Sequence, residues 1–314
     1  MRTAGAVMGP REWLLLLVLA TLWGGSFFLG KVAIAELHPF SVVLGRVALA
    51  AVALNLLVRV SGRRMSRTPA TWGALLVMGA LNNVIPFSLI FWSQTWIDSG
   101  LAAILNATTP LFTILLAHAL TDERLTAGRL GGVLFGLIGV AVMIGPEALT
   151  HLGSQVVAQL MVLGAACSYG CASIFGRRFR GTPPLVTAAG QVSASAALML
   201  PLALLADRPW ELPLPHFQVL GAVAGLALLS TTIAYVIYFR LLAAAGPTKL
   251  VLVTLLIPVS ALLLGTTILG ERLEAQSLAG MALIALGLAT VDGRLLALLR
   301  ARARTRLVAD ESAA

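Results

Sequence analysis

The chain has 314 residues, of which 59% are hydrophobic and only 11% are charged. A soluble globular domain carries roughly 25% charged residues, and a chain with so little charge cannot cover its surface in water. The composition therefore excludes a water-soluble globular protein and predicts a membrane protein built from many apolar segments.

The formal net charge of +9 is also typical of nucleic-acid-binding proteins, which are the alternative class. Those proteins gather Lys and Arg on one solvated face, beside aromatic rings that stack on bases. Here the basic residues occupy the short gaps between apolar runs, as they do where positive charge orients membrane helices. We therefore expect membrane lipid as a partner, and no nucleic acid.

Ten apolar runs are long enough to cross a bilayer, which takes about 20 residues of helix. Each run is continuously apolar, whereas strands of a membrane barrel alternate between apolar and polar residues. The sequence thus predicts an all-α membrane protein with ten transmembrane helices. In chain order, the predicted helices 1 to 10 are Trp13–Ile34, Phe40–Val58, Thr71–Thr95, Ser99–His118, Thr126–Gly145, Ser154–Phe175, Pro184–Ala206, Phe217–Leu242, Pro247–Leu269 and Ala275–Val291.

The positions of the basic residues predict how these helices are oriented. With the N-terminus placed inside, 18 of the 22 Lys and Arg residues fall on the inner side and three on the outer side, while Arg46 lies within helix 2. Because positive charge favours the cytoplasmic side of a membrane, we expect both termini in the cytoplasm.

The two halves of the chain resemble each other. A shift of 148 positions aligns helices 3 to 5 with helices 8 to 10 without a gap, and a shift of 146 aligns helix 1 with helix 6. Each half holds five helices, so the second copy must enter the membrane from the opposite side, as in the inverted repeats of secondary transporters. We expect a first repeat over 1–147, a second over 148–295 and a basic cytoplasmic tail over 296–314. The aligned residues include Pro110 with Pro258, Phe87 with Tyr235, Phe91 with Phe239, Glu123-Arg124-Leu125 with Glu271-Arg272-Leu273, Gly132 with Gly280 and Gly139 with Gly287.

Ten spans, the five-plus-five repeat, Trp23-Gly24 in helix 1 and a Glu-Arg-Leu triplet after helices 4 and 9 occur together in a known family. In these features the chain resembles the EamA-type branch of the drug/metabolite transporter superfamily, and within it the YddG-type aromatic amino-acid exporters. The resemblance covers almost the whole chain. It implies a central cavity lined by helices 1, 3, 4, 6, 8 and 9, and the export of metabolites, amino acids or drugs across a bacterial inner membrane.

Two prolines lie at matching places in the repeats. Inside a helix, Pro110 would leave the carbonyl of Asn106 without its donor, and Pro258 would do the same for Thr254. Unpaired backbone at membrane depth must face protein, water or a cavity. We therefore predict hinges at Pro110 and Pro258 beside a substrate site; the alternative is that Asn106 and Thr254 only bond to neighbouring helices.

Aromatic and polar residues form matching stripes in both repeats. Aromatic rings beside amide and hydroxyl groups suit a substrate with an apolar body and a polar end, and an aromatic amino acid fits that description. The alternative is that the hydroxyl and amide groups join helices and the aromatic rings are interfacial anchors. The candidate substrate-binding residues are Trp23, Ser26, Asn82, Asn83, Phe87, Asn106, Tyr169, Ser173, Thr231, Tyr235, Tyr238 and Thr254.

Charged residues are rare inside the predicted spans. Arg46 invites a substrate carboxylate, but a structural pairing or extension to the outer interface is favoured. No carboxylate lies at mid-membrane, where a proton carrier is usually found. This favours facilitated diffusion over proton exchange. Together with the export that the resemblance implies, the expected activity is outward transport of small amphipathic metabolites, amino acids including aromatic ones, by alternating access.

Other activities have less support. The sequence shows no H-E-x-x-H, no G-x-S-x-G and no Cys/His cluster with zinc spacing, so we expect no catalytic residue, metal or cofactor. A multidrug exporter of the same superfamily and a channel remain as alternatives. The sequence leaves open whether the protein is a monomer or a homodimer.

Overall fold

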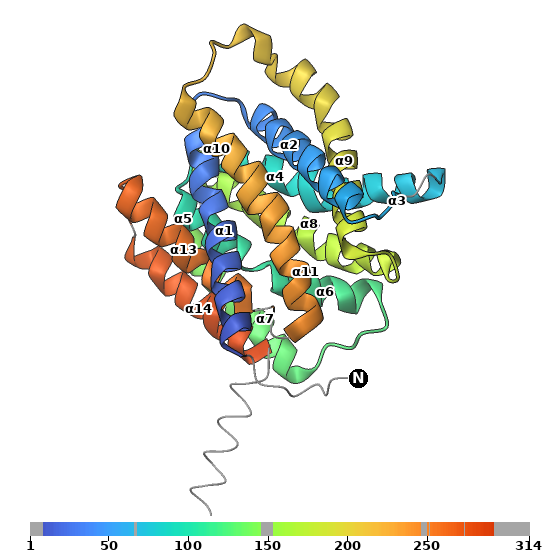
Figure 1. Ribbon diagram of the computed structural model, residues 1–314. Coiled ribbons are helices and arrows are strands. Elements are labelled where there is room, and N and C mark those ends of the chain that lie inside the picture. The colour runs from blue at the N-terminus through green and yellow to red at the C-terminus, as the bar shows by residue number, and fades with distance from the viewer. Residues whose placement is uncertain are drawn as a thin grey trace, which may run out of the picture.

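The computed structural model describes residues 9–65, 68–145, 153–245, 250, 252–272 and 274–291. Within these residues every regular element is helical and there is no strand (Figure 1). The predicted cytoplasmic tail and Pro247, at which helix 9 was predicted to begin, lie outside the described residues.

At membrane depth a helix satisfies every backbone amide and carbonyl within its own segment, which is why continuous apolar runs become helices. The helical stretches begin and end within three residues of the predicted bounds, except at the start of helix 9, when the π-helical turn Ala203–Asp207 is counted with α9. Their bounds are α1 Pro10–Ala33, α2 Pro39–Val60, α3 Pro69–Gly79, α4 Ile85–Ser93, α5 Ser99–Asn106, α6 Thr109–Leu120, α7 Ala127–Ile144, α8 Ser154–Phe175, α9 Pro184–Leu202, α10 Phe217–Ala227, α11 Ala234–Ala245, α13 Leu252–Ile268 and α14 Ala275–Val291.

Within the described residues, eight helical stretches have the length and apolar composition to cross a bilayer. Two further apolar helices, α13 and α14, have 17 residues each. The prediction of an all-helical membrane protein with many apolar helices is confirmed. These ten segments correspond one to one with the ten predicted runs.

Helices 3 and 8 are less regular than the sequence suggested. A π-helical turn, η1 (Ala80–Val84), joins α3 to α4, and another, η6 (Leu228–Ile233), joins α10 to α11. The shift of 148 positions places the first residue of η1 on the first residue of η6, so both halves carry the same irregularity. Such turns concentrate at functional sites because they redirect side chains and backbone carbonyls.

Predicted helix 4 divides into two helices. Helix α5 ends at Asn106, and Pro110 occupies the first turn of α6, where the missing amide costs no hydrogen bond. The carbonyl of Asn106 accepts a hydrogen bond of 2.7 Å from the hydroxyl of Thr109. The prediction that Pro110 leaves this carbonyl free inside a kinked helix was therefore wrong. Pro258, in contrast, lies inside α13.

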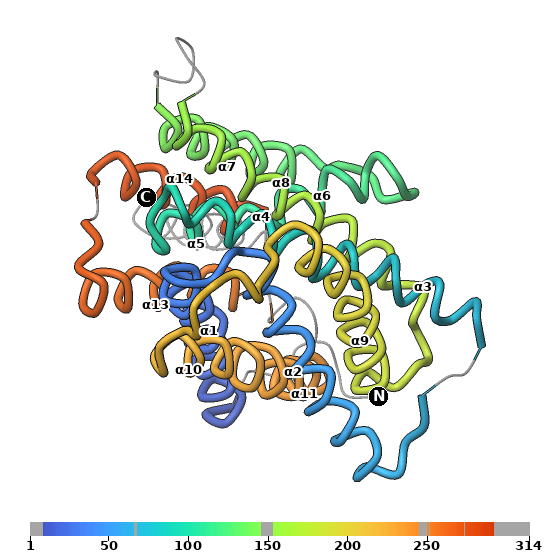
Figure 2. The backbone as a smooth tube through the Cα atoms, turned by 90° about the horizontal axis from the view of Figure 1, so that it is seen from above, coloured from blue at the N-terminus to red at the C-terminus, as the bar shows by residue number. Residues whose placement is uncertain are grey.

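The two halves of the chain interlock through reciprocal helix pairs. Helix α1 packs on α13 and α8 packs on α6, while α2 packs on α9 and α7 on α14. Figure 2 shows α4, α6, α7 and α8 along one side of the molecule, with α1, α10 and α11 along the opposite side. Each of these four pairs joins a helix of the first half to a helix of the second half.

Helices α7 and α14 approach each other with backbone against backbone. A Cβ atom added to Gly132 would lie 2.6 Å from the carbonyl oxygen of Gly287, and one added to Gly139 would lie 2.8 Å from that of Gly280. Real Cβ atoms do not come this close to a carbonyl oxygen. These glycines thus serve helix packing inside the chain, as small residues do at membrane helix interfaces.

We expect Gly139→Ala to lower the free energy of unfolding by about 1–3 kcal/mol, because the added methyl group must push α7 away from α14. Gly131→Ala is the matched control, since its Cβ would meet nothing within 4 Å. Thermal unfolding of the two purified variants in detergent measures the difference. Equal melting temperatures for the two variants would contradict the close contact.

Candidate functional site

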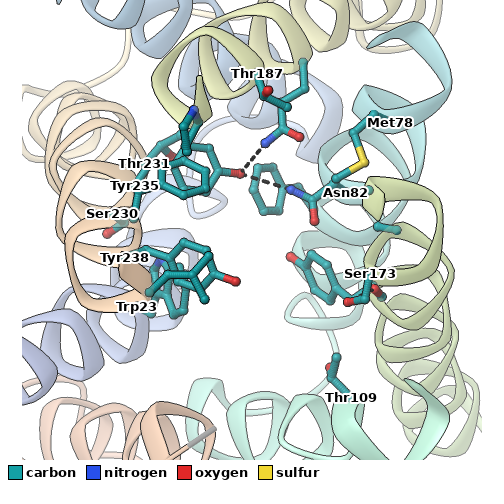
Figure 3. Close-up of a pocket in the computed structure, with 18 of the residues that line it drawn as sticks. Trp23, Met78, Asn82, Thr109, Ser173, Thr187, Ser230, Thr231, Tyr235 and Tyr238 are labelled. Atoms are coloured by element: carbon teal, nitrogen blue, oxygen red, sulfur yellow. Dashed lines mark hydrogen bonds between the residues drawn. The ribbon is translucent and has the colours of Figure 1, made fainter. Parts of the chain in front are cut away.

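A cavity of about 650 Å³ lies among helices of both halves (Figure 3). Its size falls within the range of about 300–1,000 Å³ that is common for small-molecule sites. All but one of the twelve candidate substrate-binding residues lie in its wall. These are Trp23, Ser26, Asn82, Phe87, Asn106, Tyr169, Ser173, Thr231, Tyr235, Tyr238 and Thr254.

One side of the cavity is an aromatic wall. Figure 3 shows Trp23 and Tyr238 side by side, with Ser173 facing them across the open space. The ring centroids of Trp23 and Tyr238 are 5.5 Å apart, and Phe239 continues the wall 5.2 Å beyond Tyr238. This wall offers flat apolar surface to a ring-bearing ligand.

Two hydroxyl groups in the cavity wall bond within their own helices. The hydroxyl of Ser26 donates to the carbonyl of Trp23 at 2.7 Å, and that of Ser173 donates to the carbonyl of Tyr169 at 2.9 Å. These two serines therefore do not join one helix to another, which was the alternative to a cavity role. Their oxygen atoms remain available as acceptors.

Tyr235 is the centre of a buried polar network. Its hydroxyl accepts hydrogen bonds from the side-chain amides of Asn82 and Gln191 and donates one to the amide oxygen of Asn83, each at 3.2 Å. Figure 3 draws the bond from Asn82. The network joins η1, α9 and α11, and so ties predicted helices 3, 7 and 8 together beside the cavity.

Asn83 is the one candidate that does not reach the cavity. It is fully buried, and its amide nitrogen donates to the hydroxyl of Ser195 at 2.9 Å. It lies behind Tyr235 and holds that side chain in place. Helix 7 was not expected to line the cavity, yet Gln191 does so. The signal was present in the sequence, because Gln191 is the only side-chain amide in predicted helix 7.

Arg46 faces the cavity instead of extending to the outer interface. Its side chain is only 5% exposed, and its Nε donates to the hydroxyl of Thr231 at 3.0 Å. The carbon of the guanidinium lies 3.7 Å from the ring centroid of Phe87, a cation–π contact. Of the two interpretations favoured from the sequence, the structure supports a structural bond of Arg46, and it does not show extension of the side chain to the outer interface.

The two ends of the cavity differ. Arg177, Arg180 and Thr182 line its predicted inner end. At the predicted outer end, the ammonium group of Lys31 donates to the carbonyls of Gln94 and Ile97 at 2.6 and 2.9 Å. Neither Lys31 nor Gln94 lines the cavity.

Acidic side chains stay at the helix ends. Glu271 accepts hydrogen bonds from the backbone amide of Ser99 at 2.8 Å and that of Gly100 at 3.2 Å, at the start of α5. Burial, and then the charge of Glu271, raise the pKa of Asp98 at the same end. Within the described ranges no acidic residue lines the cavity, and no three His, Cys, Asp or Glu side chains gather to hold a metal.

Apolar helices that enclose a cavity with aromatic and polar walls define a multi-pass membrane transporter. The chain belongs to the EamA-like transporter family, whose sequence profile matches residues 11–145 and 156–291. The resemblance found in the sequence is confirmed at the level of the family. Membership in this family indicates a transporter and not an enzyme.

The chain is similar to proteins from several bacteria over most of its length. A probable amino-acid metabolite efflux pump of Salmonella typhimurium is 27% identical over 90% of this chain and 94% of its own. Protein PecM of Dickeya dadantii is 27% identical over 84% and 86%, and the uncharacterized protein PA1977 of Pseudomonas aeruginosa is 31% identical over 91% and 98%. A crystal structure with 21% identity shares the fold, with a TM-score of 0.65 over 90% of this chain and 97% of that one.

Tyr235→Phe removes the hydroxyl that three amide groups share. We expect a loss of about 1–3 kcal/mol in unfolding free energy, because the amides of Asn82, Asn83 and Gln191 lose a partner in a buried place. Tyr238→Phe is the control, since its hydroxyl has no hydrogen bond to the described residues. Thermal unfolding without substrate should separate the two variants, and equal curves would contradict the network.

Proposed function

We propose that this chain exports small amphipathic metabolites, chiefly amino acids including aromatic ones, across a bacterial inner membrane by alternating access. The observation that carries the proposal is the cavity whose wall combines aromatic rings, amides and hydroxyls from both halves of the chain. Such a wall matches a cargo with a ring at one end and polar groups at the other.

The reciprocal contacts support ten spans arranged as two inverted repeats. A Cβ atom on Gly24 in α1 would lie 2.6 Å from the carbonyl of Ile257 and 3.0 Å from the amide of Ala261 in α13. Its counterpart Gly170 in α8 meets the amide of Thr113 in α6 at 3.2 Å, and Thr113 aligns with Ala261. The same glycine contact thus occurs once in each direction, as a two-fold axis between inverted repeats requires.

Against this symmetry, the two ends of the cavity are in different states. At the predicted outer end, a Cβ on Gly30 would lie 2.5 Å from the ring of Phe91 and 2.9 Å from the amide oxygen of Gln94. At the inner end, a Cβ on the counterpart Gly176 would meet only Met78, at 3.5 Å. The first contact closes the outer end, and the second leaves the inner end open.

Exchange of these two contacts gives alternating access. In the outward-open state Gly176 packs against Phe239, the counterpart of Phe91, while Gly30 separates from its partners. Arg177 now pairs with Glu123 at 2.6 Å and would move to carbonyls at the end of α11, as Lys31 now holds the end of α4. Each half then adopts the contacts that the other half has in the present structure.

The cavity also bears on the driving force. No acidic side chain among the described lining residues is placed to carry a proton with the cargo. The proposed mechanism is therefore facilitated diffusion down the gradient of the cargo. Two relatives, from Salmonella typhimurium and Escherichia coli, are named probable amino-acid metabolite efflux pumps, which agrees with the proposed cargo.

The test is counterflow into liposomes that contain the purified chain, with a panel of amino acids, sugars and cationic dyes. We expect saturable exchange of aromatic amino acids, which compete with one another, and no single-channel current. Transport of a cationic dye without any amino acid would favour the multidrug alternative. Currents without counterflow would favour a channel.

Gly176→Leu tests the inner contact directly. In the present structure a Cβ atom at this position meets only Met78, at 3.5 Å, so thermal stability should stay near that of the unchanged protein. Closure of the inner end against Phe239 should fail, and counterflow should fall at least tenfold. Gly221→Leu is the control, because its Cβ would meet nothing within 4 Å. Full counterflow by Gly176→Leu would rule out this contact as the inner gate.

A further inference from the structure

Arg46 is a buried charge that the helix packing alone does not explain. It lies within α2, in the span Pro39–Val60, and its side chain is 5% exposed and forms part of the cavity wall. A guanidinium at membrane depth costs several kcal/mol unless partners compensate for the lost water. The position of Arg46 is therefore expensive for stability and calls for a partner of opposite charge.

The structure supplies only part of that compensation. The Nε atom donates to Thr231, and the rings of Phe87 and Phe91 lie 3.7 and 6.0 Å from the guanidinium carbon. Among the described residues no carboxylate pairs with Arg46, and its two terminal nitrogens have no hydrogen-bond acceptor. The ion pairs in that part of the chain join Arg177 to Glu123, Arg208 to Glu211 and His216 to Glu36.

The two terminal nitrogens form a fixed fork. Thr231 holds the guanidinium at one edge and Phe87 supports its face, so its plane is set before a ligand arrives. A planar guanidinium with two free nitrogens matches the two oxygens of a carboxylate. A cargo with a carboxylate group could therefore supply the anion that the described part of the protein does not place beside Arg46.

A second group in the wall lacks a partner. The side-chain oxygen of Asn106 is buried and accepts no hydrogen bond, although Asn106 forms part of the cavity wall. A buried acceptor without a donor lowers the stability of the protein. Rotation of the amide about its χ2 bond would turn this oxygen towards the cavity, where an ammonium group could donate to it, and no carboxylate among the described lining residues competes for that role.

We infer that Arg46 binds the carboxylate of the cargo and Asn106 accepts a hydrogen bond from its amino group, so that the site selects zwitterionic α-amino acids over amines. The inference rests on the proposed export function and names the residues that decide the cargo. Lipophilic cations are excluded, because they would meet the positive charge of Arg46 and find no acidic side chain in the described wall. The aromatic wall at Trp23 and Tyr238 then takes the side chain of the amino acid.

The experiment measures counterflow of L-phenylalanine by the full chain in liposomes, with three competitors that each lack one feature. Phenethylamine lacks the carboxylate, phenylalanine methyl ester masks its charge, and 3-phenylpropionate lacks the amino group. For the unchanged protein, we expect L-phenylalanine to compete at least tenfold better than the amine and the ester.

Arg46→Gln should weaken competition by L-phenylalanine and by 3-phenylpropionate by tenfold or more, and leave competition by phenethylamine unchanged or improved. Arg46→Lys keeps the charge without the planar fork and should give an intermediate loss. Asn106→Leu should weaken L-phenylalanine while leaving 3-phenylpropionate unaffected. Thermal unfolding verifies that each variant is folded, and the shift caused by added L-phenylalanine gives a second measure of binding.

A purely structural Arg46 predicts a different result. Arg46→Gln or Arg46→Lys would then lower stability or total transport and keep the preference for L-phenylalanine over phenethylamine, which would overturn the inference. An unchanged protein that exchanges the amine as well as the amino acid would overturn it too, while leaving a transporter. Failure of the unchanged protein to exchange any compound of the larger panel would overturn the export function itself.

Discussion

The cost of a polar group without a partner at membrane depth governs the centre of this molecule. Water is scarce there, so each amide, hydroxyl or charge must find a partner on another helix or face the cavity. The hydroxyl of Tyr235 is the hydrogen-bond partner of three side-chain amides. The hydroxyl of Thr109 donates to the carbonyl of Asn106, where the helix breaks. Arg46 has a hydrogen-bond partner only for its Nε, and we infer that the cargo supplies partners for the rest of the guanidinium.

The same constraint applies to both halves of the chain, which resemble each other. Both halves carry a π turn at the equivalent place, and both bury a glycine of their first helix against the fourth helix of the other half. Where the halves differ, the difference has a direction: the helix breaks before Pro110 but continues through Pro258, and Gly30 is covered while Gly176 is open. Similar halves with unequal contacts are what the proposed alternation between two states requires.

Much of this arrangement could be predicted from the sequence. Hydropathy gave the helix bounds to within a few residues, because a bilayer fixes both the length and the apolarity of a span. The stripes that pointed to Tyr235 and Trp23 were visible because both repeats present them. Two features could not be predicted. The π turns and the helix break depend on small competing hydrogen bonds, and the inward direction of Arg46 depends on Thr231, which is 185 positions away in the chain.

The charge of the cavity also fits the proposed mechanism energetically. Moving one elementary charge across a membrane potential of 100 mV changes its free energy by about 2.3 kcal/mol. In a cell with a negative interior, this potential holds cations inside, so an exporter without ion coupling would work against it for a cationic drug. A zwitterion carries no net charge and leaves down its own gradient. A cavity lined by Arg46, Arg177 and Arg180, with no acidic side chain in its described wall, is therefore suited to the cargo that uncoupled export can move.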